Sequence, residues 1–326
     1  MVAAGATAWA LTSGDDGPDR SVGSAAPSST TAPATTTAPP GTTAAPASTA
    51  PRPPEIDRTY SVLTATRTFV DPARPTSPNG AFAGAPARTL PVSFWYPDGP
   101  GPFPLVAFSH GYAVTPEYYA PMLERWAASG YVVAAPTYPI LSGEPGGASH
   151  VDYEQTFTDT SFVISQILGL GAGDPVGALV DGSRVAAAGH SDGEVIAFGV
   201  GFLECCRDPR VRAVVAMAGN LANADNPHVR DTGTPILHVM ETGDEYDPYP
   251  ASIAWDREHL TAPRWMLTLE GATHVPPYQA AGDAHFELLV RAVVDFLDAT
   301  LNDRPDRLDR MAATIAASPD LATLER

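Results

Sequence analysis

The sequence predicts an α/β fold in which a mostly parallel sheet is covered by helices on both faces. From about residue 60 onward, short strand-like runs alternate with longer helix-like runs, the pattern of strands joined by crossover helices. The central strand-like runs are continuously apolar, as strands buried on both faces are. The chain has 326 residues, 44% of them apolar, so it is long enough to bury a sizeable core.

We expect eight strands, most of them short and apolar, with turn residues at their ends. They are Tyr60–Phe69, Leu90–Tyr96, Leu105–Ser109, Val132–Pro136, Val185–Gly189, Ala213–Ala218, Ile236–Met240 and Met266–Leu269. Helices are expected between them, and the last has apolar residues at helical spacing. They are Glu117–Ser129, Tyr153–Leu168, Ser191–Leu203, Ile253–His259 and Ala284–Leu301. The tail, residues 302–326, reads as one more amphipathic helix or a frayed end.

The N-terminal region predicts export. Residues 1–12 are small or apolar and uncharged, too few to span a bilayer and without the basic start of a complete signal peptide. We expect a truncated signal or anchor remnant; a frayed terminus is the alternative. Residues 13–55 should be a disordered linker, since Ser24–Pro51 contains only Ala, Pro, Ser and Thr besides Gly41. Residues 56–326 then form the folded domain of a secreted or cell-surface anchored protein.

Charge and cysteine content exclude several classes of function. The 37 acidic residues against 19 basic ones give a net charge of −18, which disfavours nucleic acid and anionic membrane surfaces as partners. Every basic residue is Arg, which indicates a GC-rich, bacterial genome. The two cysteines are adjacent, at Cys205 and Cys206, which excludes a multi-disulfide scaffold and a cysteine zinc cluster. We expect two inert thiols there, with a vicinal disulfide as the alternative. We also expect the protein to be a monomer.

The sharpest chemical signal is Gly189-His190-Ser191-Asp192-Gly193. It follows an apolar strand and opens a helix, as the G-x-S-x-G nucleophile elbow requires. A nucleophilic serine must project from a tight strand-to-helix turn, where flanking side chains would clash, and glycine removes them. The helix N-terminus adds a positive dipole near a developing oxyanion. Ser191 is therefore the predicted nucleophile.

A second signal, Ser109-His110-Gly111-Tyr112, follows another predicted strand. An oxyanion hole needs a backbone N–H from such a loop and one from the residue after the nucleophile. We therefore predict that the N–H groups of Tyr112 and Asp192 form the hole. The side chain of Tyr112 is also placed to line the acyl pocket.

The nucleophile needs a base and an orienting acid. His274 lies on a loop directly after a late strand, where the chain order of Ser, acid, His puts the base; His285 is its rival. Asp244 follows Gly243 after the strand Ile236–Met240, at the carboxyl edge of the sheet. Asp247 is the alternative acid, because the following proline favours an extended backbone there.

From about Tyr60 to Leu301 the chain resembles serine α/β-hydrolases, especially the lidless branch of chlorophyllases, platelet-activating-factor acetylhydrolases and cutinase-like polyester hydrolases. The motifs that carry the resemblance are Trp95-Tyr96-Pro97, Phe103-Pro104-Leu105-Val106, Ser109-His110-Gly111-Tyr112, the elbow, Gly243-Asp244 and Gly271-Ala272-Thr273-His274. The resemblance implies an eight-stranded α/β-hydrolase fold and a cofactor-free, metal-independent carboxylic ester hydrolase. It also implies the triad Ser191, Asp244 and His274, with the oxyanion hole at Tyr112 and Asp192.

Three departures bear on the substrate. Glu194 and the charged Asp192 lie at the elbow, and no cysteine follows Cys206; the last two points weigh against PET hydrolysis. The thirteen residues Leu221–Gly233 leave no room for a large lid. For substrate binding we single out Tyr112, Tyr138 and Tyr246, on loops near the predicted site. We expect hydrolysis of short-to-medium acyl or polyester-like esters; a cell-wall acyltransferase and a catalytically dead surface module are the alternatives.

Overall fold

The computed structural model describes residues 59–219, 228–230, 232–246, 249–261 and 263–326. The expectations for residues 1–12 and 13–55 concern the chain outside these ranges, as do Asp247 and most of Leu221–Gly233. Within the ranges described, no helix is long and apolar enough to cross a membrane.

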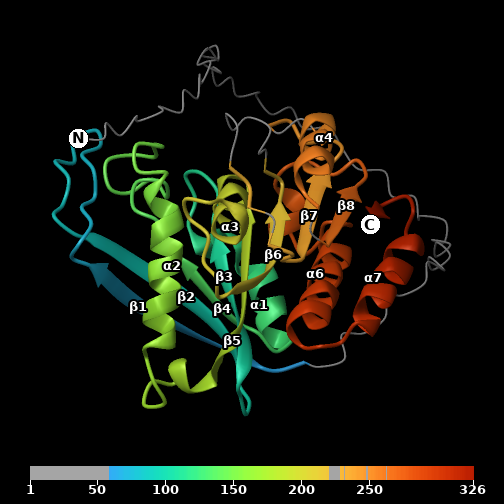
Figure 1. The fold of residues 1–326 in the computed structure, drawn as a ribbon, viewed down its shortest axis with the longest axis horizontal. Coiled ribbons are helices and arrows are strands. Elements are labelled where there is room, and N and C mark those ends of the chain that lie inside the picture. Colours follow the sequence, from blue (N-terminus) through green and yellow to red (C-terminus); the bar gives the residue numbers. More distant parts are fainter. Residues whose placement is uncertain (1–58, 220–227, 231, 247–248, 262) are drawn as a thin grey trace, which may run out of the picture. The chain divides into compact units, whose positions relative to one another are not determined.

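A nine-stranded sheet forms the centre of the domain, in the order β1-β2-β4-β3-β5-β6-β7-β8-β9 (Figure 1). Its strands are β1 (Val62–Asp71), β2 (Arg88–Pro97), β3 (Phe103–Ser109), β4 (Val132–Pro136), β5 (Val180–His190), β6 (Val211–Met217), β7 (Ile236–Glu241), β8 (Arg264–Leu269) and β9 (Ala322–Glu325). Pairs from β4 to β8 are parallel, whereas β1, β2 and β9 join antiparallel. The mostly parallel sheet is confirmed.

The predicted count of eight strands is wrong by one. The tail forms helix α7 (Asp306–Ala316) and then β9, which pairs with β8. The amphipathic helix expected in the tail is therefore present, but the four-residue strand after it was missed. Thr323 and Glu325 alternate with Ala322 and Leu324, a pattern too short to separate a strand from a frayed end.

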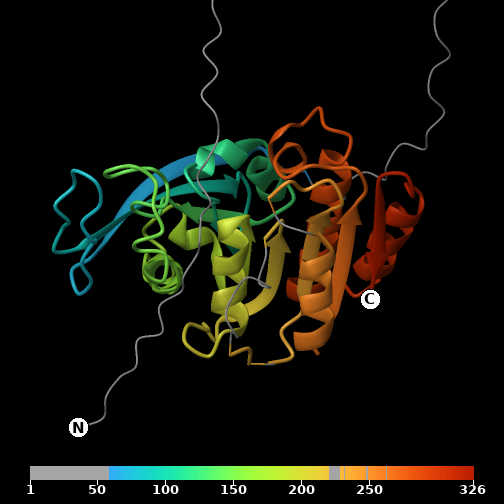
Figure 2. The ribbon, with the colours of Figure 1, turned by 90° about the horizontal axis from the view of Figure 1, so that it is seen from above.

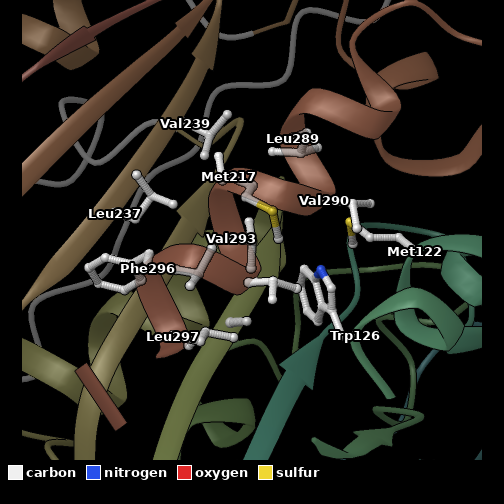
Figure 3. Packing of buried hydrophobic residues seen from close by; sticks show 14 of the residues in the cluster. Met122, Trp126, Met217, Leu237, Val239, Leu289, Val290, Val293, Phe296 and Leu297 are labelled. Carbon is white, nitrogen blue, oxygen red and sulfur yellow. The ribbon is translucent and has the colours of Figure 1, made fainter. Parts of the chain in front are cut away.

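Helices cover both faces of the sheet (Figure 2). The apolar residues of α2 (Gln155–Leu168) and α3 (Asp192–Phe202) pack on one face, and Trp255 of α4 (Tyr249–His259) joins them. On the other face α1 (Ala120–Ala128) and α6 (Phe286–Leu301) pack against β6 and β7, where Trp126 meets Met217 and the α6 side chains (Figure 3). Both faces are therefore buried, as the continuous apolar strands require.

The nucleophile helix α3 ends near a vicinal disulfide. Cys205 and Cys206 are bonded to each other, so the expectation of two inert thiols is wrong. Sequence could not decide the point, because two adjacent cysteines are compatible with either state. The bond consumes both cysteines of the chain.

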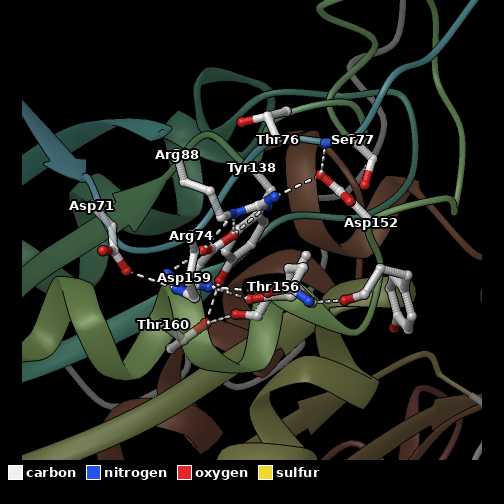
Figure 4. Close-up of polar contacts among 12 residues, drawn as sticks. Asp71, Arg74, Thr76, Ser77, Arg88, Tyr138, Asp152, Thr156, Asp159 and Thr160 are labelled. Carbon is white, nitrogen blue, oxygen red and sulfur yellow. Dashed lines mark hydrogen bonds and ion pairs between the residues drawn. The ribbon is translucent and has the colours of Figure 1, made fainter. Parts of the chain in front are cut away.

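A buried ionic network ties β2 to α2 (Figure 4). The guanidinium of Arg88, fully buried, donates to both oxygens of Asp159 at 2.6–3.0 Å and to Asp152 at 2.6 Å. Burial alone would lower the pKa of Arg88, but the two carboxylates outweigh it and raise that pKa. Arg74 adds a second cation, 2.7 Å from Asp159. The pairing matters because a buried charge without its partner is strongly destabilising.

We predict that Asp159→Asn lowers the free energy of unfolding by about 3–5 kcal/mol, because it leaves Arg88 buried and incompletely paired. The matched control is Glu287→Gln, which breaks a bidentate pair with Arg125. The side chains of Arg125 and Glu287 are 37% and 38% exposed. That change should cost about 1 kcal/mol or less, since solvent screens exposed pairs. Urea denaturation of both variants measures the difference, and equal losses would contradict the prediction.

Candidate active site

Ser191 sits in the sharp turn between β5 and α3. Its backbone has φ 59° and ψ −127°, a left-handed conformation that is strained for a residue with a side chain. The two flanking glycines are required by contact: a Cβ on Gly189 would lie 1.9 Å from the carbonyl oxygen of Gly193. A Cβ on Gly193 would lie 2.1 Å from the carbonyl oxygen of Ser109. The structure thus has the strand, turn and helix that the elbow pattern predicts.

Three predicted side chains form a continuous hydrogen-bonded chain. The Ser191 hydroxyl lies 3.0 Å from His274 Nε2, and His274 Nδ1 lies 2.7 Å from Asp244 Oδ2. The Asp244 side chain is fully buried, and its other oxygen accepts the Tyr246 N–H at 2.8 Å. An imidazole held this way by a carboxylate presents Nε2 to the serine, which is the geometry of a nucleophile, a base and an orienting acid.

The loops after β7 and β8 bring Asp244 and His274 together. The Gly243 N–H donates to the Ala272 carbonyl at 3.0 Å, and a Cβ on Gly243 would lie 2.8 Å from that oxygen. The rival base His285 is engaged elsewhere, with Nε2 donating to the Glu270 carbonyl at 3.0 Å. The rival acid Asp247 lies outside the described residues.

The loop after β3 lies directly against the nucleophile. A Cβ on Gly111 would be 3.1 Å from the Ser191 Cβ. Among the residues that the structure describes, no acceptor takes the backbone N–H of Tyr112 or of Asp192. Both donors are therefore free to bind a developing oxyanion, the role that the sequence predicts for them.

Two buried histidines connect the loops of the site through hydrogen bonds. His110 accepts the Tyr138 N–H at Nε2 and donates from Nδ1 to the Gly111 carbonyl. His190 donates from Nε2 to the His274 carbonyl at 2.8 Å and accepts the Tyr119 hydroxyl at Nδ1. Each ring uses one nitrogen as donor and one as acceptor, so each is neutral.

Burial is the main reason that these rings stay neutral. It lowers the pKa of His110 to about 4, and burial together with the neighbouring His274 lowers the pKa of His190 to about 3. The Tyr119 hydroxyl also accepts the Gly111 N–H at 3.2 Å, so His190 and Tyr119 connect the oxyanion loop to the His274 loop. The sequence pattern does not predict this role, because both partners of His190 lie far from it in the sequence.

The three tyrosines expected to bind substrate fall into two groups. Tyr112 and Tyr246 are 43% and 69% exposed, and the Tyr246 ring lies 4.9 Å from the His274 ring. Tyr138 is fully buried, with its hydroxyl 2.7 Å from both Ser109 and Thr160. The assignment of Tyr138 to substrate binding is therefore wrong: its hydroxyl is satisfied by two core hydroxyl groups, and solvent cannot reach its ring.

Two acidic residues near the triad, Glu194 and Glu241, are fully buried. Glu194 is fully buried below the elbow, 3.7 Å from His238, and a Cβ on Gly219 would lie 2.0 Å from its Oε2. Glu241 is also fully buried and accepts the Tyr278 hydroxyl; burial raises its pKa well above the usual value. In the ranges described, no group of three or more His, Cys, Asp or Glu side chains is placed to hold a metal ion.

Comparisons with known proteins support the α/β-hydrolase fold. A chlorophyllase family model matches residues 75–220. Among solved structures, a ferulic acid esterase from Streptomyces cinnamoneus aligns with a TM-score of 0.59 at 22% identity, covering 87% of this chain and 98% of that one. No curated protein sequence matches the chain. At this identity the structural likeness shows a shared fold, and a fold alone does not select a substrate.

We predict that stability falls as the pH drops from 6.5 toward 4. The unfolded histidines bind protons near pH 6.5, whereas folded His110 and His190 remain neutral down to about pH 4 and 3. The unfolded chain therefore holds more protons in this window, and each group contributes a loss of up to about 1.4 kcal/mol per pH unit. Urea denaturation at several pH values from 7 to 5 measures the slope.

His110→Asn is the variant that assigns the slope to a residue. The asparagine amide can replace the Nδ1 donor to Gly111 but does not titrate. We expect a lower absolute stability and a shallower dependence of the unfolding free energy on pH. A slope equal to that of the wild type would show that His110 does not contribute to acid sensitivity.

Proposed function

We propose that this chain, a carboxylic ester hydrolase of the α/β-hydrolase superfamily, works through a covalent acyl-enzyme formed on Ser191. The chlorophyllase match and the fold shared with a ferulic acid esterase support ester hydrolysis. The observation that carries the mechanism is the hydrogen-bonded chain from Ser191 through His274 to Asp244, placed on a strained elbow beside two free backbone N–H groups.

Ser191, His274 and Asp244 each have a defined role in the reaction. The Ser191 oxygen attacks the ester carbonyl while His274 Nε2 takes its proton, and Asp244 stabilises the imidazolium that results. The carbonyl oxygen becomes an oxyanion that accepts the N–H groups of Tyr112 and Asp192. His274 then returns the proton to the leaving alcohol. Water, activated by the same imidazole, attacks the acyl-enzyme and releases the acid and Ser191.

Exposed tyrosine rings on the loops of the site bear on the choice of ester substrate. The Tyr246 ring is 69% exposed and lies beside the His274 ring, and Tyr112, 43% exposed, follows Gly111, whose backbone lies against Ser191. Aromatic rings at an open site offer apolar contact to an acyl chain or stacking to an aromatic acyl group. We therefore propose esters of short-to-medium acyl chains, including aromatic or polyester-like acids.

Two features support a protein that works outside the cytoplasm, either secreted or attached to the cell surface. The Ala-, Pro-, Ser- and Thr-rich residues 13–55 have the composition of an extended tether. The bond between Cys205 and Cys206 is a state that oxidising compartments maintain. We further propose that nucleic acid is not a partner, since the chain carries a net charge of −18.

The test is hydrolysis of p-nitrophenyl esters from acetate to laurate by the full chain and by Ser191→Ala. We expect the wild type to turn over the shorter esters, and Ser191→Ala to lose roughly 10⁴-fold or more in kcat because the nucleophile is gone. Rapid release of one equivalent of p-nitrophenol before steady state would reveal the acyl-enzyme. Added alcohols separate the acyltransferase alternative, which would give transester product in preference to free acid.

Two results would count against the proposal. Equal activity in the wild type and Ser191→Ala would place the reaction elsewhere. A wild type that is inert toward every ester and does not react with a fluorophosphonate would favour the catalytically dead surface module.

A further inference from the structure

One side chain contacts both residues of the proposed oxyanion hole. Tyr112 follows β3 and Asp192 follows β5, so the two N–H donors belong to separate segments of the chain. The His150 imidazole is stacked on the Tyr112 ring, with centroids 4.7 Å apart and planes 19° from parallel. Its Nε2 lies 2.7 Å from Asp192 Oδ2. His150 thus bridges two segments whose relative position the reaction depends on.

Neighbours of His150 on the same loop make matching contacts. The Tyr112 hydroxyl donates to the Ala148 carbonyl at 2.8 Å, and the Tyr153 hydroxyl donates to the Asp192 carbonyl at 2.7 Å. The Tyr153 ring also meets the His150 ring edge to face at 5.4 Å. The loop between β4 and α2 therefore holds each oxyanion residue by two separate contacts.

That loop is itself fixed by the connection between β1 and β2. The Asn79 amide donates to the carbonyl oxygens of Pro145 and Gly147 at 3.1 and 2.7 Å. A Cβ on Gly146 would lie 2.1 Å from the Asn79 carbonyl oxygen, so the two segments are in close contact. Asp152 accepts the Ser77 N–H at 3.0 Å and pairs with buried Arg88. His150 is therefore held by a loop anchored on both sides of it.

The ion pair has little to do with stability. The side chains of His150 and Asp192 are 39% and 27% exposed, and solvent-screened pairs contribute little to folding. The hydrogen bond that His150 donates to Asp192 raises the pKa of His150 against the opposing effect of burial, which favours the charged pair. What the pair does provide is geometry, because it fixes the first residue of α3 relative to the loop after β3.

We propose that His150 is a positioning residue that sets the separation of the Tyr112 and Asp192 N–H groups for oxyanion binding. The inference rests on the proposed function and adds a residue to it. His150 acts through the ring of one donor residue and the carboxylate of the other. Its loss should leave substrate binding largely intact and weaken the transition state, since two donors misplaced by about an ångström stabilise an oxyanion poorly.

The test compares His150→Ala with His150→Gln on a p-nitrophenyl ester that the wild type hydrolyses. We expect His150→Ala to lower kcat by about tenfold to a hundredfold, with KM changed by less than about threefold because ground-state contacts remain. A glutamine amide places a donor where the imidazole Nε2 was, so His150→Gln should recover most of kcat. A purely structural role would not give this split between kcat and KM or this rescue.

Asp192→Asn approaches the same pair from the other side while keeping the backbone N–H. We expect it to lower kcat. The double variant with His150→Ala should lose no more kcat than the more damaging of the two single variants, since the two residues act as one unit. The matched control is His259→Ala: its ring also stacks on an aromatic ring, Trp255, at 4.4 Å, but at the far end of α4. That variant should keep the wild-type kcat.

Each outcome separates the inference from the proposed function. An unchanged kcat in folded His150→Ala, judged by its melting temperature, would overturn the inference and leave ester hydrolysis standing. A raised KM at constant kcat would also overturn it, because His150 would then hold substrate. A wild type inert toward all esters would overturn the proposed function, and the positioning role with it.

Discussion

The absence of two Cβ atoms at the elbow determines how close the catalytic segments come. β3 and β5 are parallel neighbours with Ser109 opposite Gly189, so their ends reach the same level of the sheet. Gly193 then packs on the Ser109 carbonyl and Gly189 on the Gly193 carbonyl at distances that exclude any side chain. This close approach brings the loop after β3 against Ser191, directly before α3 begins. The positions of the nucleophile and of both proposed oxyanion donors follow from it.

Different forces hold the sheet and the loops. Apolar side chains on both faces hold the strands, but the loops at their carboxyl ends are fixed by hydrogen bonds with defined donors. Neutral His110 and His190 each connect two loops, and Arg88 anchors the approach to α2 through Asp152 and Asp159. Such bonds are directional, and leaving one unmade in the interior is costly. The network therefore favours one arrangement of these loops over the many arrangements that they could otherwise adopt.

The sequence predicts what depends on local pattern. Continuous apolar runs mark the central strands, and the glycines around Ser191 mark the elbow. Asp244 and His274 could be placed because strand order fixes which loops meet, although their roles stay a prediction until activity is measured. Tyr138 was misjudged because it follows a strand like an exposed rim residue, yet its ring packs in the core and its hydroxyl bonds to Ser109 and Thr160. His150 carries no local signal, since its pairing with Asp192 spans 42 positions.

The bond between Cys205 and Cys206 also determines how this chain can be labelled. It uses the only two cysteines present, and the chain therefore offers no thiol to a maleimide dye under non-reducing conditions. A single cysteine engineered at an exposed position such as Val151 would then be the unique attachment point. A fluorophore there would report the environment of the loop that carries His150 without background from the rest of the molecule.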